Sequence, residues 1–346
     1  MKYLSLFSGI EAASAAWGPL GWEPLAFSEI DPFPSAVLAR HYPEVKNLGD
    51  VTRFHEWPDL EPDIIVGGSP CQAFSIAGLR KGLDDPRGNL TLTYLAVVDR
   101  YRPRWVVWEN VPGVLLHDGG RTFGTFLGAL AELGYGWAYR VMDAQYVRVQ
   151  SHPRAVPQRR RRVFVVGCAG DGRRAAQVLF EPESLRGNPP PRREAGASVA
   201  AIAGGRPASG GAEGVAPTIP SRRSAGGGLG TDFDCDGGLI AFGGNNTQGP
   251  IDVATARNAS ATASGRMDFE SETFLVADAT ASLGVRRLTP TECEALQGFS
   301  RGYTDIIYRG KRAADGPRYK SLGNSMATNV MSWIGQRIKI ASVSAL

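Results

Sequence analysis

The stretch YLSLFSGIEA, residues 3–12, takes a short apolar run into a tight turn at Phe7, Ser8, Gly9 and Ile10. Glycine in such a turn lets backbone approach a ligand at the carboxyl edge of a parallel sheet. A second apolar run ends at Glu29, at the spacing where an acid binds the ribose of a nucleoside cofactor in doubly wound folds. Together, the turn and the acid predict an adenosine site.

The same turn argues against a dinucleotide. A dinucleotide-binding chain carries GxGxxG here, because its glycines cradle a pyrophosphate at a helix N-terminus. This chain has Glu11 and Ala12 where the further glycines would stand. We therefore expect a cofactor without phosphates.

Residues 1–168 alternate short apolar runs with helical patterns, which predicts an α/β fold with a doubly wound, mostly parallel sheet. A helix is expected over 122–133, and after Arg287 further helices are expected over 291–297 and about 325–339, the last rejoining the first sheet. The expected strands are Tyr3–Phe7, Pro24–Ser28, Ile64–Gly67, Trp105–Glu109 and Arg162–Val166.

Composition changes after Gly170, where glycine, proline, serine and alanine dominate to about residue 285 and take up the surplus of the chain's 43 glycines. A weak duplication, 232–241 against 268–277, predicts paired strand and turn units of a small second domain. The expected organisation is a catalytic and cofactor-binding domain over 1–168, a smaller glycine-rich domain over 169–285, and a segment over 286–346 that returns to the first domain.

Bulk properties exclude several classes of protein. No apolar run approaches the roughly 20 residues of a membrane-spanning helix, and four widely separated cysteines argue against a zinc site or a disulfide framework. A cytoplasmic protein without a metal is expected. Ten of the arginines lie between Arg154 and Arg193, which favours a polyanionic partner, with a basic solvated face as the alternative.

Three further elements carry candidate chemistry. Cys71 follows Gly67-Gly68-Ser69-Pro70 on a loop at the carboxyl edge of the sheet, and Glu109 ends the strand predicted over 105–109. Arg160 and Arg162 precede the last strand and, two residues apart, share one face. Each alone has an ordinary structural explanation, so their coincidence at one sheet edge is the argument for a site.

In this order, the motifs resemble the DNA cytosine-5 methyltransferases, whose fold is the S-adenosylmethionine-dependent methyltransferase type. The similarity covers most of 1–168 and 287–335. It rests on Phe7-Ser8-Gly9, Ser28-Glu29-Ile30-Asp31, Gly49-Asp50-Val51, Pro70-Cys71-Gln72, Glu109-Asn110-Val111, Gln158-x-Arg160-x-Arg162, Arg287-Leu288-Thr289-Pro290, Leu296-Gln297-Gly298-Phe299 and Gly323-Asn324-Ser325.

The resemblance implies a mechanism. Cys71 would add as a thiolate to carbon 6 of cytosine, which makes carbon 5 able to accept a methyl group from S-adenosyl-L-methionine. Glu109 would bond the ring N3 and the exocyclic amine, and Arg160 and Arg162 would supply part of the positive field that favours the thiolate. Loss of the carbon 5 proton and of the cysteine then restores the ring.

The resemblance also implies the binding residues. The cofactor would contact Phe7, Ser8, Gly9, Ile10, Glu29, Ile30, Asp50, Val51, Pro70, Leu90, Asn324 and Ser325. Double-stranded DNA would be the partner, with the target cytosine flipped out of the duplex. Its contacts are expected from the loop after the cysteine, at Gln72, Ser75, Arg80, Lys81 and Arg87, and the glycine-rich domain would recognise the target sequence.

The chain departs from the family pattern at Glu11 and Ala12, at an insertion over 147–155, and at Met326. Two alternatives stay open: the same chemistry on RNA, and a catalytically silent DNA-binding protein. A monomer is expected, in a bacterial or phage-infected cell and associated with the nucleoid. A restriction-modification system, phage protection and an orphan enzyme would look alike.

Overall fold

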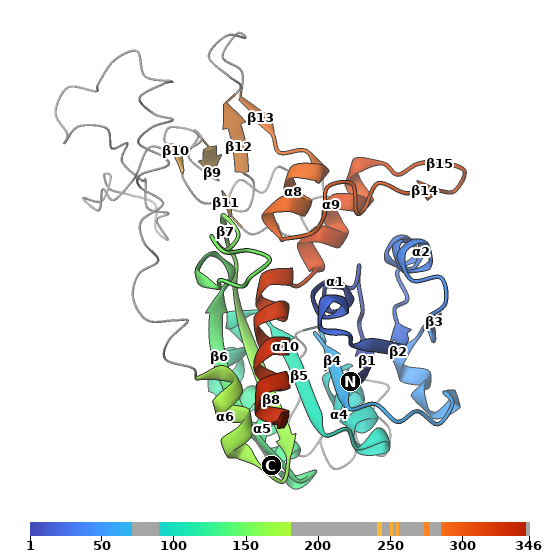
Figure 1. The fold of residues 1–346 in the computed structure, drawn as a ribbon, viewed down its shortest axis with the longest axis vertical. Helices are drawn as coiled ribbons and strands as arrows, with labels where there is room; N and C mark the ends of the chain where they lie inside the picture. The colour runs from blue at the N-terminus through green and yellow to red at the C-terminus, as the bar shows by residue number, and fades with distance from the viewer. Residues whose placement is uncertain are drawn as a thin grey trace, which may run out of the picture.

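A seven-stranded sheet forms the centre of the molecule in the computed structural model (Figure 1). The structure describes residues 1–70, 90–180, 241–243, 250–251, 254–255, 273–276 and 285–343. The strand order is β3-β2-β1-β4-β5-β8-β6, and β8 alone runs opposite to its neighbours. The strands are β1 (Lys2–Leu6), β2 (Glu23–Ser28), β3 (Lys46–Asn47), β4 (Ile64–Gly67), β5 (Trp105–Asn110), β6 (Tyr135–Asp143) and β8 (Arg161–Ala169). The predicted fold class, a mostly parallel α/β sheet, is confirmed.

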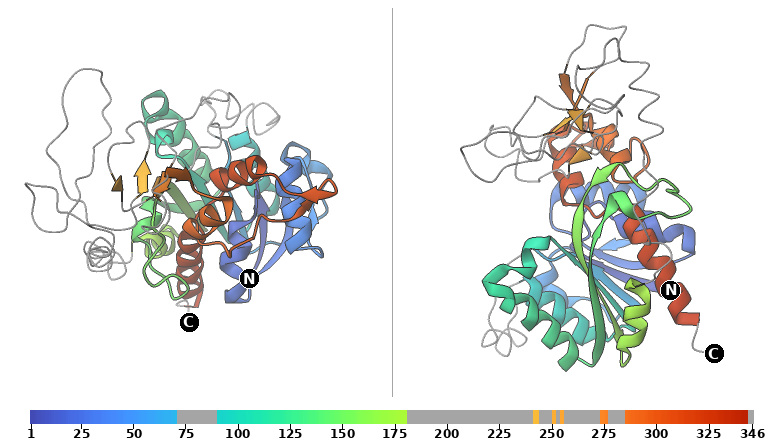
Figure 2. Two further views of the ribbon diagram at one scale, coloured as in Figure 1. Left: turned by 90° about the horizontal axis from the view of Figure 1, so that it is seen from above. Right: turned by 90° about the vertical axis from the view of Figure 1, so that its left-hand side faces the viewer.

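Helices cover both faces of this sheet (Figure 2). One face packs against α1 (Ala12–Trp17), α2 (Pro32–His41), α6 (Gly172–Leu179) and α10 (Thr328–Val343). The other face packs against α4 (Leu90–Tyr101) and α5 (Arg121–Glu132). Short 3₁₀ turns are η1 (Gly18–Leu20), η2 (Val51–Glu56), η4 (Pro112–Leu115), η5 (His117–Gly120) and η6 (Ala144–Tyr146). No helix in the described part of the chain is both long and apolar enough to span a membrane.

Smaller elements lie beyond the carboxyl edge of the sheet. Helices α8 (Pro290–Leu296) and α9 (Asp315–Asn324) are joined through a hairpin of β14 (Ile307–Tyr308) and β15 (Lys311–Arg312). β7 (Gln158–Arg159) pairs with β11 (Ala254–Thr255). A four-stranded sheet contains β10 (Pro250–Ile251), β9 (Ala241–Gly243), β12 (Thr273–Val276) and β13 (Val285–Arg287). β12 lies within the second copy of the sequence duplication, β9 begins at the last residue of the first copy, and the two strands are antiparallel neighbours. The proposed domain boundaries stay predictions.

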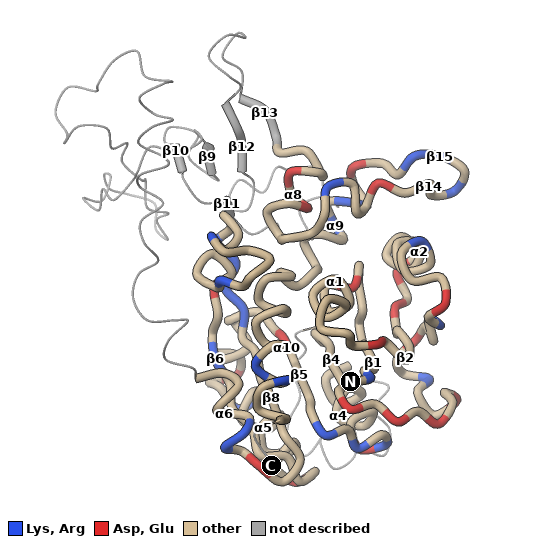
Figure 3. Tube along the Cα trace, viewed as in Figure 1, with Lys and Arg blue, Asp and Glu red and all other residues tan. Residues whose placement is uncertain are grey.

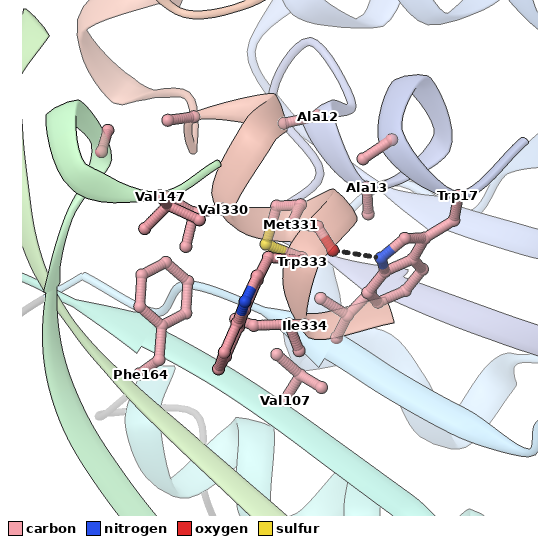
Figure 4. Close-up of a cluster of buried hydrophobic side chains, with 14 of the residues drawn as sticks. Ala12, Ala13, Trp17, Val107, Val147, Phe164, Val330, Met331, Trp333 and Ile334 are labelled. Carbon is pink, nitrogen blue, oxygen red and sulfur yellow. Dashed lines mark hydrogen bonds between the residues drawn. The ribbon is translucent and has the colours of Figure 1, made fainter. Parts of the chain in front are cut away.

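Helix α10 packs the C-terminal segment onto the first sheet. Its residues Val330, Met331, Trp333 and Ile334 are buried against α1 and the sheet (Figure 4). The Trp17 indole nitrogen donates a hydrogen bond of 2.8 Å to the Met331 carbonyl. Gly335 lies so close to Trp17 that a Cβ atom there would come within 2.5 Å of the indole nitrogen.

A buried ion pair fastens α8 to α9. Glu294 is fully buried and accepts hydrogen bonds from the Gly302 and Thr304 amides and from the Thr304 hydroxyl. Arg318, only 5% exposed, donates from Nη2 to Glu294 Oε1 over 3.1 Å. A buried carboxylate is stable only when a cation and hydrogen-bond donors surround it, and Glu294 has both.

The contact between Gly335 and Trp17 yields a stability prediction. Gly335→Ala should lower the free energy of unfolding by about 1–3 kcal/mol, because the added methyl group overpacks the contact of α10 with α1. Gly128→Ala in α5 is the matched control, since nothing lies within 4 Å of its Cβ position, and it should raise stability by about 0.5–1 kcal/mol. Urea unfolding measures both. Equal effects of the two substitutions would contradict the described packing.

The ion pair of Glu294 with Arg318 yields a second stability prediction. Arg318→Met should lower the free energy of unfolding by about 3–5 kcal/mol, because it leaves a buried carboxylate without its cation. Arg312→Met removes a comparable pair with Asp305, but the Arg312 side chain is 76% exposed, so the change should stay under about 1 kcal/mol. Unfolding of both variants at pH 7 checks this, and similar losses would show that burial does not set the value of the pair.

Candidate active site

The site begins at the turn after β1, at the edge where the parallel strands end. The Ser8 amide donates to the Ser28 carbonyl over 3.1 Å, which ties the turn to the end of β2. The Gly9 amide donates to Glu29 Oε2 over 2.8 Å, and the Asp31 amide donates to Glu29 Oε1 over 2.7 Å. The predicted turn and the predicted acid are therefore in direct contact.

A small cavity, open to solvent, lies over this turn. Five of the predicted cofactor residues line it: Phe7, Ser8, Gly9, Asn324 and Ser325. One wall comes from the start of the chain and the other from the end of α9. The other described lining residues are Ser5, Leu6, Glu11, Ala12, Ala13, Val66, Gly68, Glu109 and Met326.

The charge of this lining indicates what the cavity suits. Two of the described lining residues, Glu11 and Glu109, carry carboxyl groups, and none of them is Lys or Arg. Phosphate sites use basic side chains or several convergent backbone N–H groups, whereas here the Gly9 amide is taken up by Glu29. The acidic lining therefore fits a cationic ligand without phosphates. S-adenosylmethionine is such a ligand, because its sulfonium is attached to an adenosine.

Seven of the predicted cofactor residues do not line the cavity as described. Glu29 touches its floor through Gly9, while Ile10 is buried in the core and Ile30 is 72% exposed. Asp50 is exposed and caps η2 by accepting from the Thr52 amide over 2.9 Å. Val51 is buried at the start of η2, and Pro70 is exposed directly before Cys71. Leu90 is the first residue of α4.

The loop that leads to Cys71 is held tightly by its neighbours. A Cβ atom on Gly67 would meet the Leu6 carbonyl oxygen at 2.5 Å, and one on Gly68 would meet Glu109 Oε2 at 2.8 Å. Ser69 receives a hydrogen bond from the Trp108 indole and another, through its carbonyl, from the Asn110 amide, each of 3.0 Å. The peptide entering the cysteine is thus fixed against β5. Cys71, Gln72, Ser75, Arg80, Lys81 and Arg87 themselves lie outside the described residues.

Glu109 forms an ion pair at the rim of the cavity. Its Oε1 lies 3.0 Å from Nε of Arg162, and the two side chains are 12% and 17% exposed. Burial raises the pKa of the Glu109 carboxyl, and the guanidinium groups of Arg162 and Arg160 oppose that rise. A carboxyl in this balance is suited to exchanging a proton with a bound ligand.

Arg160 is buried beside this pair. It is 2% exposed, and its Nη2 donates to the carbonyls of Gly323 and Ser325, which joins this segment to the end of α9. Its Nε and Nη1 atoms have no hydrogen-bond partner in the described part of the chain. Burial, reinforced by Arg162, lowers the pKa of Arg160 to about 9 while Glu109 opposes that shift. The structure thus brings Arg160, Arg162 and Glu109 together.

Basic residues continue outward from this point. Figure 3 shows Lys and Arg along β7 and β8, where Arg159 and Arg161 are exposed. The inserted segment 147–155 lies next to them and is anchored from below, because Asn329 of α10 donates from Nδ2 to the carbonyls of Ala144 and Val147. The insertion therefore packs on the fold rather than projecting from it, with Val147 and Val149 buried.

Eight of the described lining residues had no role assigned from the sequence, and two of them, Glu11 and Met326, stand out by their chemistry. Glu11 was recognised only as a departure from a glycine pattern, yet its side chain is buried under the cavity. Met326 was likewise seen only as a departure and lines the opposite wall. Position could have indicated both, since each adjoins predicted cofactor residues in the sequence.

Similarity to known proteins agrees with this geometry. Residues 1–340 match the family model of the C-5 cytosine-specific DNA methylases. The chain is 27% identical to Type II methyltransferase M2.BsuMI of Bacillus subtilis, over 98% of this chain and 75% of that protein. The fold resembles that of the S. pombe Dnmt2 methyltransferase, with a TM-score of 0.59, 14% identity and coverage of 98% of this chain and 99% of that chain.

A phage protein shows higher identity over most of the chain. The "DNA N-6-adenine-methyltransferase" of Escherichia phage P1 is 36% identical over 97% of this chain, which spans 61% of that protein's length. That protein is named for methylation of adenine, whereas the matched family is named for methylation of cytosine. With the fold, the site and the match over residues 1–340 in agreement, the chain belongs to the C-5 cytosine-specific DNA methylase family.

Proposed function

We propose that this protein transfers a methyl group from S-adenosyl-L-methionine to carbon 5 of a cytosine in double-stranded DNA. One observation carries the proposal: Glu109, paired with Arg162, lines a cavity whose described lining holds no Lys or Arg, and a Cβ atom on Gly68, three residues before Cys71, would lie 2.8 Å from Glu109 Oε2. A proton-exchanging carboxyl, a cation-binding pocket and the approach to a thiol thus occupy one sheet edge. Membership of the family supports the same chemistry.

Cys71 is proposed as the nucleophile. Carbon 5 of cytosine is too weak a nucleophile to attack a sulfonium methyl group, but a thiolate bonded to carbon 6 pushes electrons onto carbon 5. An ordinary cysteine is only a few per cent ionised near pH 7, so nearby positive charge favours the reactive form. Arg160 and Arg162 provide such charge close to the peptide that enters Cys71. After transfer, the carbon 5 proton leaves, the sulfur–carbon bond breaks and the aromatic ring is restored.

Glu109 is proposed to hold the cytosine ring. As sulfur adds to carbon 6, negative charge develops towards N3, and a protonated carboxyl at N3 neutralises it. The described environment supports this role, because burial raises the Glu109 pKa while Arg162 keeps the side chain oriented. Arg160, with two unpartnered nitrogens in the described structure, supplies further positive potential.

The proposed DNA contacts follow from the need to expose the target base. Carbon 6 is inaccessible in a stacked duplex, so the cytosine must leave the helix at a cost of a few kcal/mol. Gln72, Ser75, Arg80, Lys81 and Arg87 are proposed to offset that cost through phosphate and sugar contacts. The segment 169–285 is proposed to recognise the target sequence. The exposed Arg159 and Arg161 extend the basic surface towards that segment.

Adenine methylation at N6 is the second candidate, because the phage P1 relative is named for it. An exocyclic amine attacks a methyl donor directly, so that reaction needs no thiol nucleophile. Mass spectrometry of nucleosides from treated DNA separates the two products, since 5-methylcytosine and N6-methyladenine differ in base. N6-methyladenine alone would overturn the proposed reaction. RNA offered in parallel tests the remaining substrate, and label found in RNA alone would exclude DNA as the substrate.

The nucleophile assignment predicts a large loss of activity. Cys71→Ala should lower methyl transfer by roughly 10⁴-fold or more, because the covalent route disappears. It should also abolish covalent trapping by oligonucleotides that contain 5-fluorocytosine. Cys168→Ala is the control, since Cys168 is a free cysteine buried in the core, and it should retain both properties. Bisulfite sequencing of DNA from expressing cells measures transfer, and activity of the Cys71 variant would disprove the assignment.

The proposed role of Glu109 predicts a loss of kcat without a loss of DNA binding. Glu109→Gln should lower kcat by about 10²–10⁴-fold, because an amide cannot donate and recover the required proton. DNA binding should change little, since the role concerns the reacting ring. The matched control is Glu132→Gln, an exposed carboxyl at the end of α5, which should behave as the unmodified protein. Single-turnover kinetics with a filter-binding assay would show whether the loss lies in chemistry, and unchanged kcat in the Glu109 variant would reject the role.

A further inference from the structure

Glu11 combines features that are energetically unfavourable in a structural residue. Its side chain is 1% exposed, and its backbone has φ of 66°, a left-handed conformation that L-residues other than glycine rarely adopt. It lines the cavity over the β1 turn. Strained backbone and buried charge persist where they serve a function, so the residue calls for a ligand-based explanation.

The carboxyl of Glu11 is held firmly by three donors. Ser5 Oγ donates to Oε2 over 2.8 Å, and Ser14 donates to Oε1 from its amide over 3.0 Å and from its hydroxyl over 3.1 Å. The Ser14 hydroxyl also lies 2.6 Å from the Tyr3 hydroxyl. These contacts orient the group, and all of them are neutral. They solvate a negative charge without neutralising it.

Glu11 has no cationic partner among the described residues. The contrast with Glu294 is direct, because that equally buried carboxylate pairs with Arg318. No Lys or Arg lines the cavity beside Glu11, and its charged neighbour is another acid, Glu29, which raises its pKa further. Buried carboxylates are normally paired with a cation. A cation bound in the cavity would complete this pairing.

Capping of α1 does not account for this arrangement. Glu11 is the N-cap residue and accepts from Ser14, but α1 spans six residues and needs one acceptor at this position. Ser, Thr, Asn or Asp at an N-cap provides that acceptor without burying a long carboxylate. The second carboxyl oxygen of Glu11 accepts a hydrogen bond from Ser5 Oγ, and this bond is not needed to cap the helix.

We propose that Glu11 is the counter-ion for the cationic end of the methyl donor and makes the pocket favour the donor over its product, which has lost the sulfonium charge. This inference rests on the proposed use of S-adenosylmethionine. Preference for the charged form matters because the product otherwise competes for the same contacts after each turnover. Glu11 thus acts as a specificity residue for the cofactor, and the methyl transfer itself does not pass through it.

The environment of Glu11 adds a pH dependence to this selection. Burial raises its pKa to about 7, with the hydrogen bonds from Ser5 and Ser14 opposing the rise. The other titratable groups coupled to it are Glu29 and the phenols of Tyr3, Tyr42 and Tyr303, whose own pKa values are raised by burial, so the phenols stay neutral. A bound cation favours the carboxylate, so binding should release a proton near pH 7.

The direction of the pH dependence of binding follows from the linkage between ionisation of Glu11 and binding of the cation. Between pH 6 and pH 8 the ionised fraction of a group with a pKa near 7 rises from about one tenth to about nine tenths. Affinity for S-adenosylmethionine should therefore rise by about tenfold over this range. Affinity for S-adenosylhomocysteine, which lacks the sulfonium charge, should change by less.

The test is isothermal titration calorimetry of the full chain with both molecules at pH 6 and pH 8, in buffers of different ionisation enthalpy. Glu11→Gln keeps the size of the side chain and one acceptor oxygen for the Ser14 donors but removes the charge, and its NH2 group would donate to Ser5 Oγ. It should weaken S-adenosylmethionine binding by about tenfold at pH 8, weaken S-adenosylhomocysteine binding less, and abolish proton release. Glu132→Gln is the control and should match the unmodified protein.

Each result has a defined meaning. If the unmodified protein binds S-adenosylmethionine and Glu11→Gln leaves the donor-to-product affinity ratio and its pH dependence unchanged, the inference fails while the proposed function stands. If the unmodified protein binds neither molecule, the proposed function fails and this inference fails with it. If the Gln variant does not fold, Glu11→Gly replaces it, since φ of 66° suits glycine, and the same affinity ratio decides.

Discussion

The packing of α10 against α1 is the contact on which the candidate site depends. Trp17 and Met331 are joined by a buried hydrogen bond between residues 314 positions apart. Asn324, Ser325 and Met326, just before α10, lie opposite the turn after β1, and Val66, Gly68 and Glu109 complete the described lining of the cavity. Arg160 adds two hydrogen bonds, to the carbonyls of Gly323 and Ser325, which join the β7–β8 segment to the end of α9.

Much of the fold was predictable because central strands have a strong sequence signal. β1, β2, β4, β5 and β8 are apolar runs buried on both faces, and the predicted bounds fall within three residues of those described. β6 was missed because it lies at the sheet edge and mixes buried with half-buried positions, including Arg140. α9 was missed because Gly316, Pro317 and Gly323 weaken its helical pattern, and tertiary contacts such as that of Arg318 hold it in place.

The site was predictable in outline but not in its electrostatics. Turn residues and strand-end acids can be placed because parallel strands end at one edge, which brought Phe7, Gly9 and Glu29 together as expected. The pairing of Glu109 with Arg162, and the lack of such a partner for Glu11 among the described residues, depend on side-chain direction across distant segments. Periodicity carries no information about those directions. The same limit applies to Arg160, whose burial beneath the end of α9 is a tertiary property.

The location of the two cavity walls also bears on how the protein is made. During synthesis the β1 turn emerges early, whereas α9 (Asp315–Asn324) and α10 (Thr328–Val343) emerge after every strand of the central sheet. The nascent polypeptide therefore has all seven strands before it has both walls of the pocket. Fragments that end before α9 would leave the pocket without Asn324, Ser325 and Met326, so the pocket forms only after these late helices have docked.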